Sequence, residues 1–463
     1  MSRAIGLALL ALAGCATALP VSAPLAPPAA SGPFAGVHGD GIAVALPPSD
    51  WWRLFDDPAL NRHVERALAA NADLRVALAN LDVARASERL ARASRLPHLG
   101  IESGAGETRA VNQPSTTTVP TTDYDLGATV AYEVDLFGRL RSAAGASRAD
   151  VEASAAALDA ARVVIAADTV AAYVDLCGAL AGARIAGDMV AAQRRSAELI
   201  AHQFREGEVS PLELSQARAS LAEVEAIPPT FEADRKRALF RLATLQGKPP
   251  AEADQAEVGC SAPPKVAAEI PVGDGAALIA RRPDIREAER RIAAATARIG
   301  VAIADLYPRI SLGGSAGLTS GGFDGFVTPL VSWAISDRNA ARARIAATQG
   351  TAASALAQWD GVMLRALREV ESALADYQAE RARRDALVAA LSETEQTLKR
   401  ARARHRLGAD SYVLVLDAER TRNDTARQLA SSELRIAQTQ VSLFRALGGG
   451  WEQPPSARSA ARS

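Results

Sequence analysis

The chain has few aromatic residues and very little cysteine. Only 4% of its 463 residues are Phe, Trp or Tyr, although 48% are hydrophobic, and much of that content is Ala, Leu and Val. Small aliphatic side chains suit closely packed long helices better than a broad aromatic core. The three cysteines form no Cys-x-x-Cys pair, which excludes the redox and zinc motifs built on that spacing.

An excess of charge of one sign is also missing. The 52 Lys and Arg residues balance 53 Asp and Glu residues, so no strong net field indicates nucleic acid or a polybasic membrane patch. The five histidines lack metal-ligand spacing, and no nucleophile stands in a pattern with a base. We therefore expect neither an enzyme nor a cofactor, metal or nucleic-acid site.

The N-terminus has the pattern of a targeting segment. Arg3 provides a positive charge before a short apolar run that is too short to span a bilayer. This run ends in Leu12-Ala13-Gly14-Cys15, which resembles the lipobox of bacterial lipoproteins. We predict a signal peptide over 1–14, a covalent lipid on Cys15 and a lipidated tether over 15–50. The alternative is an ordinary signal peptide with a chance cysteine.

The lipid would decide where the protein resides. Several acyl chains anchor a protein stably, because each buried methylene contributes ~0.8 kcal/mol. The residue after Cys15 is Ala16, and by resemblance to sorted lipoproteins a residue other than Asp at this position indicates the outer membrane. We expect a cell outer membrane location with a lipid anchor.

Beyond the tether, the periodicity of the apolar residues changes several times between 3.6 and two. In the first half we expect a helix over 58–95, strands over 98–107 and 124–136, a long helix to about 206, and helices to about 245 with an interruption near 228. In the second half we expect a helix after 283, strands over 310–318 and 326–336, a long helix to about 407, and a last helix that ends near 447. No stretch after the signal reaches 18 apolar residues. Any membrane crossing would therefore need strands in a closed barrel.

The order of elements repeats, and so does part of the sequence. Phe204–Ser210 aligns with His405–Ser411, and Pro97 and Pro308 precede the strands at matching places. We predict a duplication. Its domains are a first repeat over 51–250 with a β-hairpin at 98–137, a linker over 251–275, a second repeat over 276–450 with a hairpin at 309–336, and a flexible tail over 451–463.

Two hairpins give four strands, which cannot close a barrel by themselves. Cyclic association of identical chains solves this problem. A dimer would make about eight strands, a barrel filled by its own side chains, whereas a trimer would make about twelve and leave a lumen. The alternation of apolar and polar residues from Tyr124 to Asp135 supplies a lipid face and a lumen face.

Six groups of residues, in this order along the chain, resemble a known family. They are Trp51-Trp52 with Asp57-Pro58, the run 133–139, Arg281–Arg286 with Ala288-Glu289, Leu306–Ile310, Leu416–Arg420 and Ala446–Trp451. Together they resemble the TolC/OprM-like outer membrane efflux proteins, and in particular the lipoprotein (NodT-type) branch. The resemblance covers nearly the whole chain after the signal.

This resemblance implies a mixed, mainly-α membrane protein. Its parts are a long antiparallel coiled-coil α-helical tunnel and four β-strands per chain that contribute to a 12-stranded trimeric transmembrane β-barrel. The implied partners are two further copies of the chain, outer-membrane lipid, a periplasmic adaptor and an inner-membrane transporter, which the resemblance suggests is of the RND type. The implied function is the exit duct of a tripartite efflux system for small molecules such as drugs.

The resemblance also implies roles for single residues. It assigns a periplasmic gate to Val413, Asp417 and Arg420, with Val413 as the constriction and the charged pair locking neighbouring helices; the alternative is a solvated ion pair at i and i+3. It assigns adaptor docking to the turns marked by Gly207 with Ser210, and by Gly408 with Ser411. Here the alternative is a plain helix cap, since glycine suits that position.

Two cysteines remain after Cys15. Helix lengths place Cys177 near the level where the helix of 58–95 begins, and the linker that carries Cys260 should lie there too. In an oxidising compartment we expect a disulfide between them, with two free buried thiols as the alternative.

Two other functions stay open at this point. One is the exit channel for type I protein secretion, and the other is a purely structural periplasmic coiled-coil lipoprotein.

Overall fold

The computed structural model describes residues 24, 26–36, 41–108, 121–253, 259–266, 268–319, 321–333 and 338–451. The chain divides into two units. The first comprises Met1–Leu25, Leu78–Ala157 and Asp284–Val362, and the second comprises Ala26–Ala77, Leu158–Pro283 and Met363–Ser463. The predicted signal peptide, Cys15 and most of the tail lie outside the described residues.

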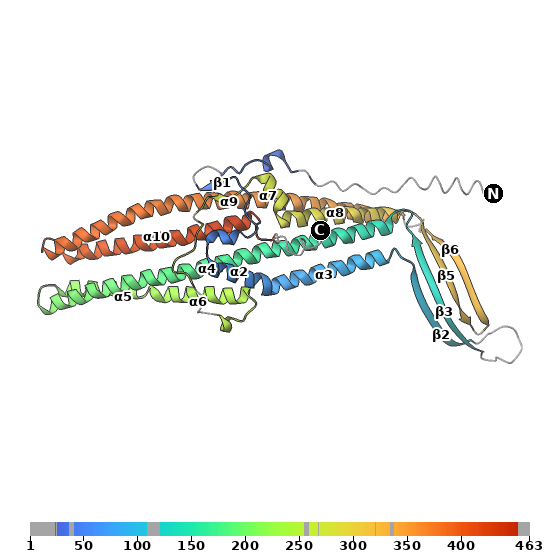
Figure 1. Ribbon diagram of the computed structural model, residues 1–463, viewed down its shortest axis with the longest axis horizontal. Helices are drawn as coiled ribbons and strands as arrows, with labels where there is room; N and C mark the ends of the chain where they lie inside the picture. Colours follow the sequence, from blue (N-terminus) through green and yellow to red (C-terminus); the bar gives the residue numbers. More distant parts are fainter. Residues whose placement is uncertain are drawn as a thin grey trace, which may run out of the picture. The chain divides into compact units, whose positions relative to one another are not determined.

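The first unit contains a four-stranded antiparallel sheet (Figure 1). Its strands, in spatial order, are β2 (His98–Thr108), β3 (Thr121–Val134), β5 (Arg309–Thr319) and β6 (Gly322–Ser332). The central pair β3–β5 joins a strand of each repeat, from Asp125↔Thr319 to Val134↔Ile310. The two predicted hairpins therefore form one continuous sheet.

The fourth strand differs from its predicted position over 326–336. It begins at Gly322, which pairs directly with Thr319, so only two residues separate the paired ends of β5 and β6. Gly322 has φ +119, a backbone conformation that only glycine adopts readily. This tight turn lets the strands pair from their first residues, which shifts β6 toward the N-terminus.

Nine helices and a few short elements make up the rest of the described residues. The helices are α2 (Pro58–Ala70), α3 (Ala72–Ala93), α4 (Arg139–Arg205), α5 (Pro211–Glu225), α6 (Pro228–Leu245), α7 (Gly275–Arg281), α8 (Pro283–Ala304), α9 (Arg338–Arg406) and α10 (Tyr412–Ala446). The short elements are η2 (Pro28–Ala30), β1 (Ile42–Ala43), η3 (Trp51–Phe55), η4 (Pro250–Glu252) and β4 (Ile270–Pro271). Among these helices α4 alone has a stretch long and apolar enough to cross a membrane, and 72% of that stretch is buried, as in a core helix.

The first predicted helix, 58–95, is wrong in one respect, because the structure breaks it at Asn71. The backbone of Asn71 is extended (ψ 138°), and its Oδ1 accepts bonds from the N–H groups of Asp73 (2.8 Å) and Leu74 (3.2 Å). Its Nδ2 also donates to the Leu245 carbonyl at 2.9 Å. A side chain that caps one helix and binds another element leaves no Gly or Pro signal in the sequence.

The predicted linker over 251–275 is followed by an additional helix that the sequence pattern did not indicate. Helix α7 begins at Gly275, after Asp274 caps it through a bond from the Ala277 N–H (2.8 Å). The backbone between α7 and α8 is extended at Arg282, because the following Pro283 disfavours the helical conformation there. The helix that begins at Pro283 is confirmed.

An aromatic cluster in the second unit joins both ends of the folded chain. Trp51 is fully buried and stacks on Phe444, with ring centroids 4.9 Å apart. Its Nε1 donates to the Gly449 carbonyl at 3.2 Å. Arg282 donates to the Ala446 carbonyl at 2.8 Å. Motifs that lie far apart in the sequence thus meet in one core.

Candidate functional site

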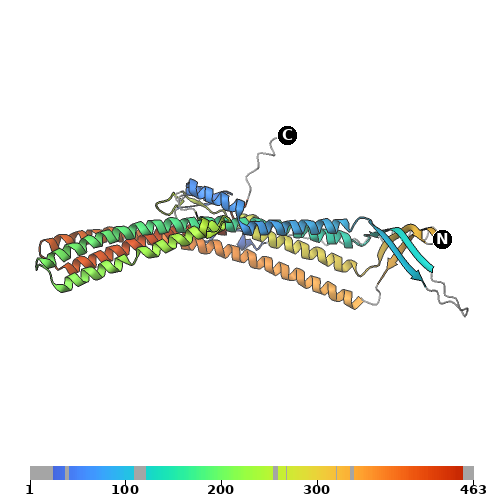
Figure 2. The same ribbon diagram turned by 90° about the horizontal axis from the view of Figure 1, so that it is seen from below.

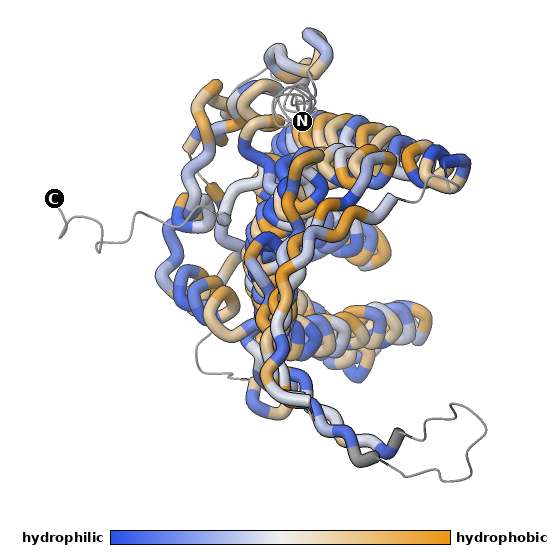
Figure 3. Tube along the Cα trace, turned by 90° about the vertical axis from the view of Figure 1, so that its right-hand side faces the viewer, coloured by the Kyte–Doolittle hydropathy of each residue, from blue (hydrophilic) through white to orange (hydrophobic). Residues whose placement is uncertain are grey.

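The register of the sheet puts apolar side chains on one face. Residues that pair directly across an antiparallel sheet lie on the same face, and Leu126 pairs with Leu318 and Tyr132 with Leu312. The apolar face carries Leu99, Ile101, Tyr124, Leu126, Val130, Tyr132, Leu312, Leu318, Phe323, Val327 and Val331. Most are exposed in the single chain, as Ile101 is at 78%. Figure 3 shows hydrophobic and hydrophilic positions alternating along the strands.

The opposite face has small and acidic residues. Its members are His98, Gly100, Glu102, Gly104, Asp125, Gly127, Thr129, Ala131, Glu133, Arg309, Ser311, Gly313, Ser315, Gly317, Asp324, Phe326, Thr328, Leu330 and Ser332. Phe326 and Leu330 are the large apolar exceptions. One face thus suits hydrocarbon and the other water, the division that a transmembrane barrel strand requires.

The sheet has two open edges within the described residues. Strands β2 and β6 are the outermost strands, and each pairs with one neighbour only. An edge strand presents unpaired N–H and C=O groups, which hydrocarbon does not tolerate. The geometry therefore demands a partner for each edge.

The run 133–139 forms the junction between strand β3 and helix α4. The Arg139 guanidinium donates to both carboxylate oxygens of Glu133, at 2.8 and 2.6 Å. The Asp135 carboxylate accepts from the N–H groups of Leu140 (3.0 Å) and Arg141 (2.8 Å), which satisfies donors at the start of the helix. These contacts fix where the sheet ends and the helix begins.

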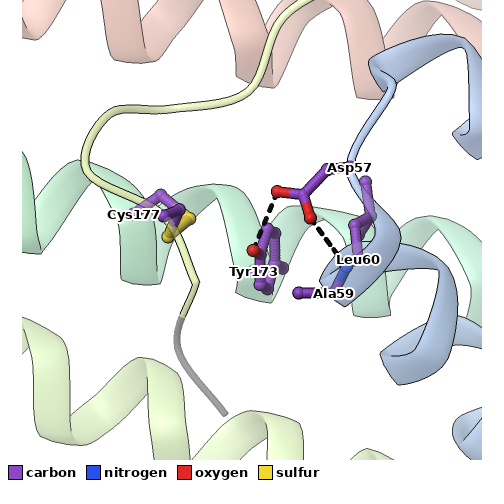
Figure 4. Close-up of a disulfide and its surroundings, with 6 residues drawn as sticks. Asp57, Ala59, Leu60, Tyr173 and Cys177 are labelled. Carbon is purple, nitrogen blue, oxygen red and sulfur yellow. Dashed lines mark hydrogen bonds between the residues drawn. A yellow bond between two sulfur atoms is a disulfide. The ribbon is translucent and has the colours of Figure 1, made fainter.

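A disulfide ties the linker to α4 (Figure 4). Cys177 and Cys260 are bonded, with their Cα atoms 5.6 Å apart. One turn earlier on α4, the Tyr173 hydroxyl donates to Asp57 Oδ2 at 2.8 Å. Asp57 caps α2 through its other oxygen. Burial, followed by this bond to a carboxylate, raises the pKa of Tyr173.

The turns that end α4 and α9 share one backbone geometry. Gly207 and Gly408 have φ of +79 and +69. After α4, the Gly207 N–H donates to the Phe204 carbonyl (3.1 Å) and the Glu208 N–H to the Gln203 carbonyl (2.9 Å), and equivalent bonds of 2.9 and 3.0 Å follow α9. Both turns are Schellman caps, so the aligned sequences form the same local structure.

The side chains of the two turns differ. Ser210 and Glu213 form a reciprocal capping box at the start of α5, whereas Ser411 makes no side-chain cap at the start of α10. The second turn has instead an ion pair in which Arg404 donates to Asp410 at 2.5 and 3.0 Å. These bonds from the guanidinium lower the pKa of Asp410.

A small apolar core holds four helices together next to these turns. Its buried members are Ala197, Ile200, Leu214, Ala217, Tyr412, Val415 and Leu416, from α4, α5 and α10, and Leu398 of α9 packs against them. In Figures 1 and 2 the pair α4–α5 runs beside the pair α9–α10 at this end. The two turns are therefore at the same end of one four-helix arrangement.

The three predicted gate residues lie on the outer face of α10. Val413 is 44% exposed, and Asp417 and Arg420 are exposed too, while the neighbouring Leu416, Ala418 and Glu419 are buried. Arg420 donates to Glu223 of α5 at 3.2 Å rather than to Asp417. A stripe of exposed apolar and charged side chains, two helical turns long, thus faces away from the core of this chain.

Sequence reasoning missed the polar contacts on the inner face of α10. The Tyr412 and Ser196 hydroxyls are 2.8 Å apart, and Arg402 donates to Glu419 Oε1 at 2.7 Å. Glu419 is only 4% exposed, and its Oε2, like Gln193 Nε2, is buried without a hydrogen-bond partner among the described residues. The available signal was the heptad spacing of Tyr412, Leu416 and Glu419, which puts a carboxylate on a core face.

The duplicated sheet-and-helix pattern matches a known family twice. The family described as "Outer membrane efflux protein" matches residues 63–248 and again residues 276–449. The chain belongs to this outer membrane efflux protein family. The two matched segments agree with the predicted duplication. The chain is thus an outer-membrane efflux channel of the TolC/OprM type, as its sequence motifs indicated.

Relatives of this efflux channel agree over nearly its whole length. Outer membrane protein OprJ of Pseudomonas aeruginosa is 33% identical, with 96% of this chain and 95% of OprJ aligned. The solvent efflux pump outer membrane protein SrpC of Pseudomonas putida is 32% identical, with 96% and 97% aligned. The solved outer-membrane channel OprN superposes with a TM-score of 0.87 at 35% identity, over 93% of this chain and 100% of that one.

Proposed function

We propose that this efflux channel works as a homotrimer whose three sheets close into one 12-stranded barrel. The observation that carries the proposal is the sheet itself, which has one apolar face and an unpaired strand at each edge. Cyclic pairing of β6 with β2 of the next chain removes every edge. Twelve strands leave an aqueous lumen on the small, polar face.

We further propose that Val413, Asp417 and Arg420 close the tunnel at its periplasmic end. Their exposure on α10 of the single chain supports this, because a stripe of Val beside two charges is available to neighbouring copies. Beside its apolar core, the inner face of α10 makes a few polar bonds to α4 and α9 and leaves Glu419 Oε2 without a hydrogen-bond partner among the described residues. A helix contact that leaves a buried carboxylate oxygen without a hydrogen bond suits a helix that must move.

The two Schellman turns are proposed as the docking ends for a periplasmic adaptor. Gly207, Ser210, Gly408 and Ser411 lie at one end of the helical arrangement, and Leu407 at the second turn is 83% exposed. A rigid turn that exposes an apolar side chain offers a defined contact. The inner-membrane partner, proposed to be an RND-type transporter, supplies the energy for transport.

The proposed anchor is a lipid on Cys15, which lies outside the described residues. Mass spectrometry of the mature N-terminus tests it: a diacylglyceryl-modified Cys15 is expected for wild type. An unmodified N-terminus at another residue would contradict it.

The proposed cargo is small molecules such as drugs. The names of SrpC and other relatives, which refer to solvent and antibiotic efflux, support this direction. Deletion of the gene should raise sensitivity to several unrelated toxic compounds, and expression of the chain should restore resistance. A deletion strain with normal resistance but without one exported protein would favour type I secretion instead.

A further inference from the structure

The face of the sheet that is small and acidic carries two side chains that break its pattern. Phe326 pairs directly with Ser315, which pairs with Thr129, which pairs with Gly100. Leu330 pairs with Ser311 on the same face. Both large side chains are mostly exposed, Phe326 at 60% and Leu330 at 58%. Large apolar groups thus project from a face that is otherwise lined by small, polar or charged residues.

The lipid does not account for these two residues. The lipid-facing residues of β6 are Phe323, Val327 and Val331, which alternate with them. Successive residues of a strand point to opposite faces, so Phe326 and Leu330 cannot join that set without a shift of register. Such a shift would turn Val327 and Phe323 away from the apolar side chains of β5, with which they now share a face.

The charged residues on this part of the face are acidic, and Asp324 is the one near Phe326. Asp324 lies two residues away on the same strand and face, and Glu102 and Asp125 occupy the same face of β2 and β3. Within the described strands, the one Arg or Lys on this face is Arg309, which begins β5. It lies far along the sheet from Phe326 and forms an ion pair with Asp305 at 2.6 Å. A carboxylate such as Asp324 beside an exposed aromatic ring attracts an organic cation, because the cation interacts favourably with the negative charge and with the face of the ring.

We propose that Phe326 and Asp324, two residues apart on the same face of β6, form a contact site in the barrel lumen for amphiphilic organic cations, with Leu330 as a further apolar contact along the path. The inference rests on the proposed trimeric barrel, in which three copies of each residue would surround the exit path. Apolar parts of the passing molecule would contact Phe326 and Leu330, while Asp324 attracts its charge. This makes the barrel a contributor to the choice of substrate rather than a plain outlet.

The test is block of ionic current through the purified channel in planar bilayers. Tetrabutylammonium and tetramethylammonium carry the same charge but differ in apolar area, which isolates the contact with Phe326 and Leu330. We expect tetrabutylammonium to block wild type severalfold more strongly than tetramethylammonium does. Phe326→Ser should remove most of that difference, and Phe326→Leu should retain it. Asp324→Asn should weaken block by both ions.

Phe323→Ser is the matched control, because it changes the same residue type on the same strand but on the lipid face. It should leave the block unchanged. Equal block of wild type and Phe326→Ser, or loss of block in Phe323→Ser instead, would overturn the inference while leaving the channel function intact. Absence of any current from both wild type and the Asp417→Ala variant would overturn the proposed barrel and this inference with it.

Discussion

At the residue scale, the chain uses the two faces of helix α10 for different purposes. The inner face buries Tyr412, Leu416 and Glu419 against neighbouring helices. The outer face presents Val413 and Asp417 without covering them. The sequence motif indicated the outer residues, but the buried ion pair of Glu419 was recognisable only once its neighbours in space were known.

The gate can be tested at Asp417. We expect Asp417→Ala to raise the single-channel conductance of the purified channel severalfold, because in the proposed gate this charge holds neighbouring copies of α10 together. Gln216→Ala is the control, since Gln216 occupies the corresponding position of the first repeat. Unchanged conductance in Asp417→Ala, or an equal rise in both variants, would contradict the proposed gate.

The second helix turn should respond to acid. Since the pKa of Asp410 is lowered in the folded chain, its bond to Arg404 stabilises the turn above the ordinary pKa of Asp, about 3.9. That contribution is lost as the pH falls through the lowered value. A spin label on Ala409→Cys should therefore keep its mobility from pH 7 to about pH 5 and gain mobility below about pH 4.

The control for this experiment is the same label in an Asp410→Asn background. That variant should be mobile already at neutral pH, and its mobility should depend less on pH. If label mobility in the wild-type background stays constant down to the acid limit of folding, Asp410 does not order the turn.

At the element scale, regular periodicity and the interruptions marked by Gly or Pro were readable from the sequence, whereas an interruption without such a residue was not. The strands, the long helices α4 and α9 and the turns at Gly207 and Gly408 follow from local patterns. The break at Asn71 could not be predicted from the local pattern. The hydrogen bonds lost where the helix is interrupted are replaced by side-chain bonds from Asn71 to α3 and to Leu245, which is distant in sequence. The position of β6 likewise depends on pairing with β5.

The seam between β3 and β5 depends on a glycine. A Cβ at Gly317 would lie 2.6 Å from both Gly127 Cα and the Leu126 carbonyl oxygen. These are backbone atoms that cannot move without breaking the pairing of the two hairpins. We expect Gly317→Ala to abolish most SDS-resistant oligomer in outer-membrane fractions on gels. Gly106→Ala, where a Cβ would meet no atom within 4 Å, should assemble normally, and normal assembly of both would contradict the seam.

The disulfide should stabilise the second unit. It joins residues 83 positions apart, and the loss of unfolded-chain entropy on closing such a loop corresponds to about 4.5 kcal/mol. Denaturant unfolding of the detergent-solubilised protein should show this loss after reduction and equally in a Cys177→Ser, Cys260→Ser variant. The double variant should be insensitive to reductant. An equal effect of reductant on the variant would mean that the disulfide is not responsible.

At the scale of the whole molecule, the single chain is incomplete. Its sheet is apolar on one face and open at both edges, and its α10 exposes apolar and charged side chains at one end of the helices. Association of identical chains around an axis would pair the open strand edges and cover the exposed side chains of α10. The sequence predicted this need from the number of strands alone.

The mass of the detergent-solubilised mature protein, measured by light scattering and corrected for bound detergent, tests the central claim most directly. We expect three chains per particle, which would close 12 strands into one barrel. A stable monomer that stays soluble without detergent would contradict it, because the apolar face of the sheet could not then be a membrane surface.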